Sequence, residues 1–423
     1  MPFEKSRNEF WLSQLEKHLT QERYSPQTVQ QSRMIGRGFL SYLNKHQIVI
    51  ETVKPIDVTR YLQYALRRYR GRHQRDPRSL NAPKAFQWWR YSHTTSICRL
   101  LRLVHGHWPP PPLPRTPAEI FQREVCEQYE EWMTDVRGWS PETRSNRSDE
   151  TRRFLCWLGE RGSRQGLLNI AAPVIDAYMM QRAKSLRRTT LKTRAVELRS
   201  FLRYLHTTGR LLLEPSTAII IPRLYTFEDI ASVLRPEDIK VLLEVTRKDR
   251  SPKGLRDFAI LTLLAGYGLR AGEITALRLE DVRWRSETLR IRHSKTSVYS
   301  DLPLLPRVGN AILDYLRKGR PQTPAREIFI RTCAPYRAFK SGSSLHRLIS
   351  LRFEAAGIKP QGRRGPHAFR HSRAATMLRA GVPIKEIGDV LGHRSAKSTN
   401  AYLKLASEDL RAVALEIPVE VNA

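Results

Sequence analysis

A run of prolines at residues 109–117, PPPPLPRTP, constrains this chain most, because it interrupts a sequence that otherwise favours helices. Proline lacks the backbone N–H donor and clashes with the preceding helical turn, so the run cannot be helical and should form an extended, stiff spacer. A second break lies near Pro215 and Pro222. These breaks predict the following division: an N-terminal domain at 1–108, a linker at 109–117, a second domain at 118–222, and a third domain with a C-terminal tail at 228–423.

The two segments ahead of the breaks carry the same pattern. YSPQT at 24–28 is matched by WSPET at 139–143, and FLSYL at 39–43 is matched by FLCWL at 154–158. Both matches are 115 residues apart (139 − 24 and 154 − 39). Serine followed by proline is a frequent helix start, and the aromatic and leucine residues have helical spacing. Such starts also occur by chance, but the constant offset favours two tandem helical bundles related by duplication.

The formal net charge of +32 and the sequence pI of about 10.6 point to a polyanionic partner. Nucleic acid is favoured over a membrane surface, since no apolar run approaches the roughly 20 residues of a membrane span. The four cysteines are scattered without metal-ligand spacing, so we expect reduced thiols and no metal site. A single basic run is typical of a solvated helix face, but the overall charge favours DNA contacts by the densest runs: Arg67, Arg68, Arg70, Arg72, Arg182, Lys184, Arg187 and Arg188.

The third segment contains several polar motifs in a fixed order. In AGYGLRAGEI at 265–274, the glycines end one helix, Arg270 begins the next, and Glu273 lies one turn later, where it can orient the guanidinium. Residues 288–305 alternate apolar and polar side chains, which predicts a β-hairpin with Lys295 at its tip. The remaining motifs lie on predicted helices or directly after them: His367 and Arg370 three residues apart, His393 after Leu-Gly, and Tyr402 nine residues beyond it.

These motifs resemble the catalytic domain of the tyrosine recombinases, the phage integrase family, over about residues 228–405. The resemblance implies a catalytic set of Arg270, Lys295, His367, Arg370, His393 and Tyr402, supported by Glu273. Lys295 is assigned only from its place in the hairpin. Residues 118–222 resemble the helical core-binding, SAM-like domain of that family through weaker motifs. The predicted fold is therefore mainly α with a small antiparallel β-sheet in the catalytic domain, preceded by two helical bundles.

The implied activity is cleavage and rejoining of DNA strands through a 3′-phosphotyrosyl intermediate made by Tyr402. Arg270 and Arg370 would neutralise the non-bridging oxygens, His367 and His393 would add donors, and Lys295 would protonate the leaving 5′ oxygen. Because the phosphotyrosyl ester stores the bond energy, no cofactor is expected. Integration, excision or transposition of a mobile element is the implied role. Further DNA contacts are predicted for Arg290, Arg292 and Arg373.

The resemblance also implies partners and a location. We expect double-stranded DNA with specific recombination sites, a homo-oligomer that is a tetramer on DNA, and no membrane. Other recombinases or accessory DNA-bending proteins are further candidate partners, and the expected location is cytoplasmic, with the nucleoid. The tail after Tyr402 either docks onto a neighbouring subunit or folds on its own domain. Two alternative functions are a type IB topoisomerase that relaxes supercoils and a non-catalytic DNA-binding protein of the same fold.

Overall fold

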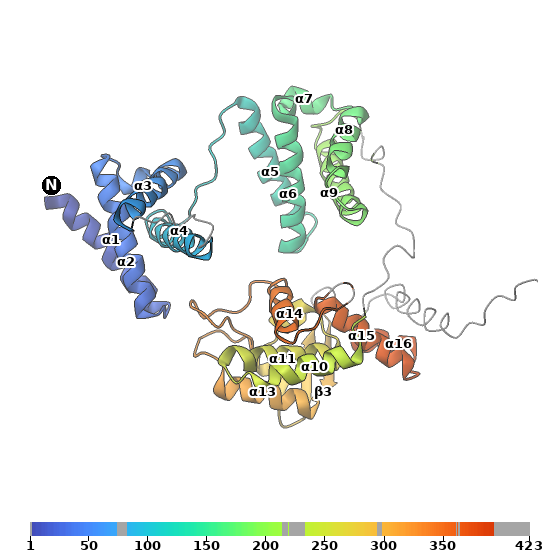
Figure 1. Cartoon of the computed structure of the whole chain (residues 1–423). Coiled ribbons are helices and arrows are strands. Elements are labelled where there is room, and N and C mark those ends of the chain that lie inside the picture. Colours follow the sequence, from blue (N-terminus) through green and yellow to red (C-terminus); the bar gives the residue numbers. More distant parts are fainter. Residues whose placement is uncertain are drawn as a thin grey trace, which may run out of the picture. The chain divides into compact units, whose positions relative to one another are not determined.

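The computed structural model describes residues 2–73, 83–213, 219, 233–293, 298–360, 362 and 364–392 of the 423-residue chain. It has two compact units, one made of Met1–Pro109 with Ile230–Ala423 and the other of Pro110–Asp229. Helices dominate both units, and the described strands form one three-stranded antiparallel sheet (Figure 1). The predicted fold class is confirmed. The division into three domains stays a prediction.

The N-terminal residues form a helical bundle with a core of its own. Its helices are α1 (Pro2–Gln21), α2 (Pro26–Lys45), α3 (Pro55–His73) and α4 (Pro83–His105), with a 3-10 turn at Ile50–Thr52. Helix α2 packs against α1 and α4. Phe39, Leu15 and Leu100 are fully buried between these helices. The apolar stripe of each helix thus supplies the core, as the helical spacing predicts.

The second unit contains a similar set of helices. They are α5 (Pro117–Asp135), α6 (Pro141–Leu158), α7 (Arg164–Leu168), α8 (Ala172–Ala183) and α9 (Arg188–Thr207), with a 3-10 turn at Gly159–Gly162. Helix α6 packs against α5 and α9, as α2 packs against α1 and α4. Phe154 is fully buried, like its counterpart Phe39.

The two Ser-Pro sequences begin their helices in the same way. The Ser25 hydroxyl accepts the Thr28 N–H at 3.3 Å, and the Ser140 hydroxyl accepts the Thr143 N–H at 3.4 Å. Both serines are extended, with φ of −60° and ψ near 150° (146° and 151°). The serine satisfies one backbone donor of the first turn, and the following proline needs none. The predicted helix starts are therefore confirmed at both positions.

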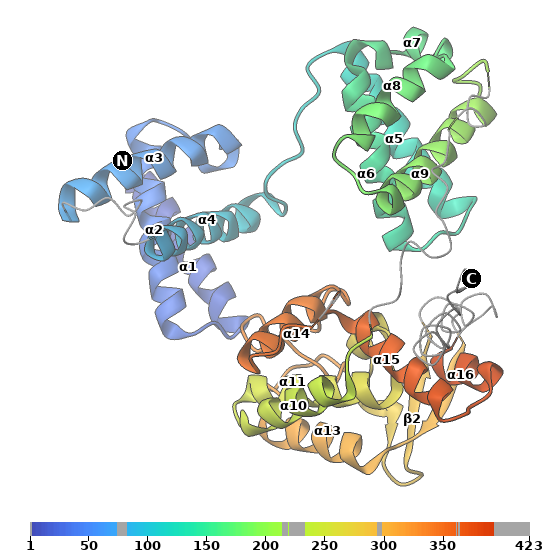
Figure 2. The same cartoon turned by 45° about the vertical axis from the view of Figure 1, so that its right-hand side comes forward.

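The C-terminal segment packs helices and a small sheet around a third core. Its helices are α10 (Pro236–Lys248), α11 (Pro252–Tyr267), α12 (Ala271–Thr275), α13 (Pro306–Lys318), α14 (Ser344–Ala355), α15 (Pro366–Arg379) and α16 (Ile384–Leu391), with a 3-10 turn at Leu279–Asp281. Its strands are β1 (Val282–Arg283), β2 (Thr288–Arg292) and β3 (Tyr299–Pro303), in the order β1-β2-β3. Figure 2 shows α15 and α16 following one another in this segment.

Alternation along β2 decides which of its side chains enter the core. Leu289 pairs with Leu302, and both are buried, whereas Arg290 pairs with Asp301 on the other face. The alternate side chains of a strand point to opposite faces, so one apolar face covers the helices. Helix α11 lies at the centre of this core and packs against α10, α13 and α15. The predicted hairpin is confirmed in its two strands.

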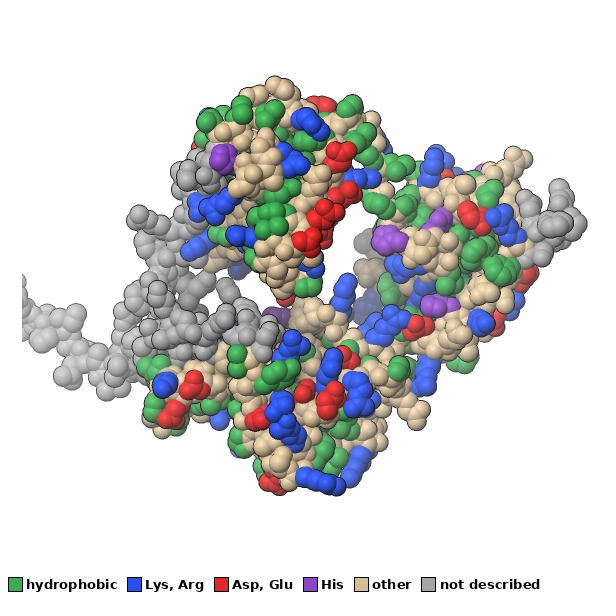
Figure 3. Space-filling model, turned by 180° about the vertical axis from the view of Figure 1, so that it is seen from behind, with side chains coloured by type: hydrophobic (Ala, Val, Ile, Leu, Met, Phe, Trp, Pro, Cys, Tyr) green, Lys and Arg blue, Asp and Glu red, His purple; other side chains and the backbone are tan. Residues whose placement is uncertain are grey.

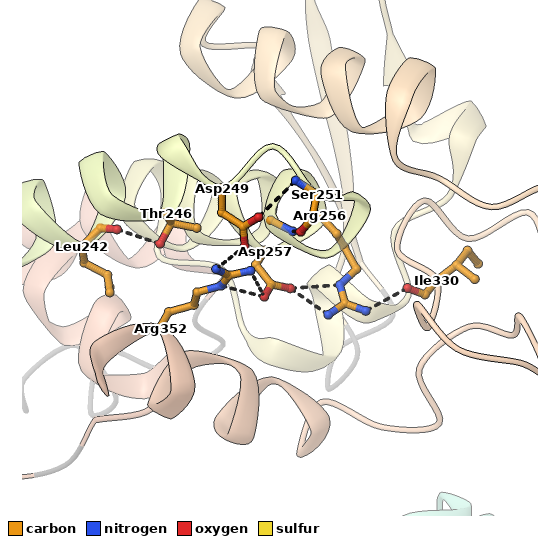
Figure 4. Close-up of polar contacts among 9 residues, drawn as sticks. Leu242, Thr246, Asp249, Ser251, Arg256, Asp257, Ile330 and Arg352 are labelled. Atoms are coloured by element: carbon orange, nitrogen blue, oxygen red, sulfur yellow. Dashed lines mark hydrogen bonds and ion pairs between the residues drawn. The ribbon is translucent and has the colours of Figure 1, made fainter. Parts of the chain in front are cut away.

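A buried ionic network connects α11 to α14 (Figure 4). The carboxylate of Asp257 accepts Arg256 Nε and Nη2 on one oxygen, at 3.0 and 2.7 Å, and Arg352 Nε on the other, at 2.8 Å. Arg352 Nη1 also donates to Asp249 at 2.7 Å, and Arg256 Nη1 donates to the Ile330 carbonyl. Each charge is paired and hydrogen-bonded, which is the condition for tolerating charges inside a core.

The surface carries cations over both units. In Figure 3, Lys and Arg side chains are scattered across the visible face and interspersed with acidic ones, rather than gathered in one patch. None of the described helices is long and apolar enough to cross a membrane.

Candidate active site

Arg270 is fixed by the turn between α11 and α12. Gly268 ends α11 in the left-handed conformation (φ 66°), and its N–H donates to the Leu264 carbonyl. The chain then enters α12 with Arg270 as its N-terminal cap residue. Glu273 reaches back from the first turn and accepts both the backbone N–H and Nη1 of Arg270, each at 2.8 Å. The predicted orientation of the guanidinium by Glu273 is therefore present.

Arg370 brings a second guanidinium to the same place. It lies on α15, is only 3% exposed, and its Nη1 donates to the Gly268 carbonyl at 3.0 Å. Its Nη2 donates to the Leu391 carbonyl, which also accepts Nη1 of Arg270 at 3.4 Å. Arg270 Nη2 donates to the Gly392 carbonyl at 3.3 Å. Two arginines that are 100 residues apart in sequence (370 − 270) thus meet at the C-terminal end of α16, where helix carbonyls carry partial negative charge.

Glu273 is the one carboxylate among the described residues that contacts Arg270. Its side chain is fully buried, and its Oε1 also contacts His293 Nδ1 at 3.0 Å. Burial by itself raises the pKa of Glu273, but hydrogen bonds from His293 and Arg270 outweigh that effect and hold the pKa below its ordinary value. The carboxylate therefore stays ionised beside the guanidinium groups.

His293 is a buried polar residue that sequence reasoning did not single out. It lies one residue beyond β2 and continues the inward-facing set of Leu289 and Ile291, so the alternation itself was the available signal. Besides Glu273, its ring contacts the Ser300 hydroxyl through Nε2 at 2.9 Å.

The other four predicted catalytic residues differ in how far the structure places them. His367 is exposed on α15, one turn before Arg370, as the three-residue spacing predicts. Lys295, His393 and Tyr402 lie outside the described residues. In the sequence, Lys295 lies between strands β2 and β3, and His393 directly follows Gly392.

The predicted DNA contacts occupy varied surroundings. Two of these arginines are engaged in ion pairs: Arg182 Nη2 with the buried Glu150 at 3.1 Å, and Arg290 with Asp301 through Nε at 2.9 Å and Nη2 at 3.1 Å. Six of the other residues have exposed side chains, and two are half-buried; the exposed ones are Arg67, Arg68, Lys184, Arg187, Arg188 and Arg292, and the half-buried ones are Arg70 and Arg373. The side chain of Arg72 lies outside the described residues.

A metal centre has no candidate in the part of the chain that the structure describes, where no three His, Cys, Asp or Glu side chains gather as ligands. The described cluster combines two fixed cations, the guanidinium groups of Arg270 and Arg370, with one carboxylate and one imidazole. Such an arrangement suits an anion with several oxygen acceptors, because guanidinium groups form strong, directional hydrogen bonds to phosphate.

Comparison with known proteins agrees with this geometry. Residues 232–409 match the model of the phage integrase family. The chain is 56% identical to the putative integrase/recombinase y4gC of Sinorhizobium fredii over 193 residues, which are 45% of this chain and 99% of that protein. It is 33% identical to the putative integrase/recombinase y4rA of the same organism over 296 residues, which are 70% of this chain and 71% of that protein.

A solved structure shares the fold. The lambda integrase tetramer bound to a Holliday junction aligns with 74% of this chain and 86% of its own, at 17% identity and a TM-score of 0.51. The described arginine cluster, the family match over the same segment and the identity to the two integrase/recombinase relatives lead to one conclusion. The chain belongs to the phage integrase family of tyrosine recombinases, whose members cleave and rejoin DNA.

Proposed function

We propose that this protein cleaves and rejoins double-stranded DNA at paired recombination sites through a 3′-phosphotyrosyl bond made by Tyr402. The observation that supports the proposal is the meeting of Arg270 and Arg370 at the Leu391 carbonyl. The described cluster holds two guanidinium groups and one carboxylate, Glu273, which pairs with Arg270, so its net charge is positive. A phosphodiester in its transition state spreads negative charge over its non-bridging oxygens and is stabilised by cations that are already in place.

In the proposed reaction Tyr402 gives its phenol proton to His367 as the phenol oxygen attacks phosphorus, and the bond from phosphorus to the 5′ oxygen breaks. Lys295 gives its proton to the departing 5′ oxygen, while Arg270 and Arg370 bind the non-bridging oxygens. His367 and His393 add donors to those oxygens. Rejoining reverses these steps with a 5′ hydroxyl from the partner strand, so no external energy source is required.

A suicide substrate tests the nucleophile. The substrate carries a nick near the scissile phosphate, so that the short 5′ fragment diffuses away after cleavage and the covalent protein–DNA complex accumulates. We expect a denaturation-resistant complex with the wild-type chain and none with Tyr402→Phe. Tyr91→Phe is the matched control, because Tyr91 is a 68% exposed tyrosine on α4. A complex that persists in Tyr402→Phe, or vanishes in the control, would rule out the assignment.

The proposed biological role is integration, excision or transposition of a mobile element by a tetramer on DNA, located with the nucleoid. The lambda integrase tetramer on a Holliday junction supports this assembly by its shared fold. Four copies of the chain should assemble with two short DNA duplexes that bear the cognate site. Analytical ultracentrifugation measures the mass of this complex. Relaxation of any plasmid, with or without a site, would instead indicate the topoisomerase activity.

We also propose that residues 1–108 form a DNA-binding domain and residues 118–222 the core-binding domain, joined by the linker 109–117. The basic side chains of α3 and the matching helix starts of α2 and α6 support this division. Deleting residues 1–108 should shorten the DNA footprint and weaken the dependence of affinity on salt, because fewer counterions are released. An unchanged footprint would contradict the proposal.

A further inference from the structure

His293 connects two separate elements of the described active-site cluster. Its ring is 2% exposed, and both ring nitrogens have hydrogen-bond partners. Nδ1 lies 3.0 Å from Oε1 of Glu273 on α12, and Nε2 lies 2.9 Å from the hydroxyl of Ser300 on β3. A buried histidine with both nitrogens engaged has a fixed ring orientation, so it can transmit that orientation to its neighbours.

The donor and acceptor roles of this ring follow from its partners. Oε1 of Glu273 accepts Nη1 of Arg270 and belongs to an ionised carboxylate, so it can only accept. Nδ1 of His293 must therefore donate its proton to Glu273. In the neutral ring, Nε2 is then the acceptor of the Ser300 hydroxyl proton. Ser300 thus donates to His293, and His293 and Arg270 both donate to Oε1 of Glu273, so the carboxylate joins the ring to the guanidinium.

The same ring also supports the end of α16. Gly392 adopts the left-handed conformation (φ 62°), and a Cβ added there would come within 2.3 Å of the His293 ring. The carbonyls of Leu391 and Gly392 accept hydrogen bonds from Arg270. His293 therefore contacts both the carboxylate and the backbone turn that together hold the Arg270 guanidinium.

We propose that His293 is a positioning residue for DNA cleavage, which acts through Glu273 and the Gly392 turn to aim the Arg270 guanidinium at the scissile phosphate. The inference rests on the proposed function, because it assumes that Arg270 balances the charge of that phosphate. Without the ring, Oε1 of Glu273 loses a donor and the Gly392 turn loses its support. The guanidinium then shifts, and a displacement on the order of 1 Å can reduce a rate about 100-fold.

Two variants and two DNA substrates test this role. His293→Ala removes the whole ring, whereas His293→Asn keeps an N–H donor near the position of Nδ1. The first substrate has an ordinary scissile phosphate, and the second has a methylphosphonate, in which a methyl group replaces one charged non-bridging oxygen. A residue that acts through Arg270 matters less when that negative charge is absent, since the arginine then has less charge to neutralise.

On the ordinary phosphate, we expect His293→Ala to cleave on the order of 10- to 100-fold more slowly than wild type at saturating DNA, with unchanged DNA affinity. His293→Asn should recover most of that rate. On the methylphosphonate, the rates of wild type and His293→Ala should converge. The cleavage rate of Arg270→Ala on the methylphosphonate, relative to wild type, shows how much of the loss of Arg270 this substrate restores.

The outcomes separate this inference from the proposed function. If wild type forms no Tyr402-dependent covalent complex on the ordinary phosphate, the proposed function fails. If wild type is active and His293→Ala cleaves at the wild-type rate, the positioning role is wrong. The positioning role is also wrong if His293→Ala is slowed equally on both substrates while the methylphosphonate restores the cleavage rate of Arg270→Ala. If His293→Ala does not fold, Ser300→Ala carries the same comparison on both substrates, because it removes only the partner that holds Nε2 of the ring, and cleavage at the wild-type rate would then overturn the inference.

Discussion

The buried carboxylate of Asp257 offers the sharpest test of what holds the catalytic segment together. Its side chain is 1% exposed and accepts three N–H groups from Arg256 and Arg352, whose side chains are 7% and 11% exposed (Figure 4). The substitution Asp257→Asn keeps the shape but removes the charge. One carboxylate oxygen is replaced by an NH₂ group, which would point a donor at a guanidinium. Arg352 retains the carboxylate of Asp249 as a partner, whereas Arg256 retains the Ile330 carbonyl and the face of the Phe339 ring but no carboxylate among its described contacts.

The structure sets the size of the expected effect. Breaking a buried ion pair by removing one partner costs about 3–5 kcal/mol, because a charge is left buried without compensation. That loss is a large part of the roughly 5–15 kcal/mol that stabilises a typical domain. For a domain of this size each kcal/mol lowers the unfolding midpoint by about 2–4 °C, so we expect a decrease of roughly 6–20 °C.

Asp301→Asn is the matched control in the same segment. Asp301 also pairs with two arginines, Arg283 and Arg290, but its side chain is 41% exposed. Water screens such a pair, so the unfolding midpoint should hardly change. Thermal unfolding of the full chain, with hydrogen exchange of peptides from α11 and α14 to assign the transition, measures both variants. Equal midpoints for Asp257→Asn and Asp301→Asn would refute the reasoning.

Three further predictions concern the active site. Gly392→Ala should abolish covalent-complex formation while DNA binding in a gel-shift assay persists, because the new Cβ meets the His293 ring and the backbone has positive φ. Arg370→Lys should slow suicide-substrate cleavage about 100- to 1,000-fold, since one ammonium cannot replace the forked donors; a loss below tenfold would contradict this. The folded-state pKa of Glu273 lies below its ordinary value of 4.5, so its contribution to stability is complete above that value and is lost as the pH falls through the lower folded-state pKa. Acid unfolding of wild type should therefore show a loss of stability below about pH 4.5 that Glu273→Gln lacks, measured by urea unfolding at each pH.

Much of the local structure could be predicted from the sequence. The Ser-Pro starts at Ser25 and Ser140, the β2–β3 strands and the return of Glu273 to Arg270 all depend on residues within one turn or one hairpin of each other. Short-range hydrogen bonds and alternating side chains decide such features, and both can be read from spacing. The order of the catalytic motifs in the sequence likewise indicates the family without the structure.

Other features were decided only by packing between distant segments. Arg182 was predicted as a DNA contact from its basic run, yet its guanidinium reaches Glu150 on another helix, 32 residues away. In the sequence His293 is an ordinary residue of the predicted hairpin, and only the fold shows that Glu273 and Gly392 lie against its ring.

The sequence alone determined which residues could serve the chemistry and which of them lie on one helical turn. Only the tertiary structure decided that Arg270 and Arg370 share the Leu391 carbonyl, because that meeting requires α11, α15 and α16 to bury their apolar faces together. Hydrophobic burial drives this packing but has no direction of its own. Spacing along one element therefore could not reveal which side chains from three elements would converge.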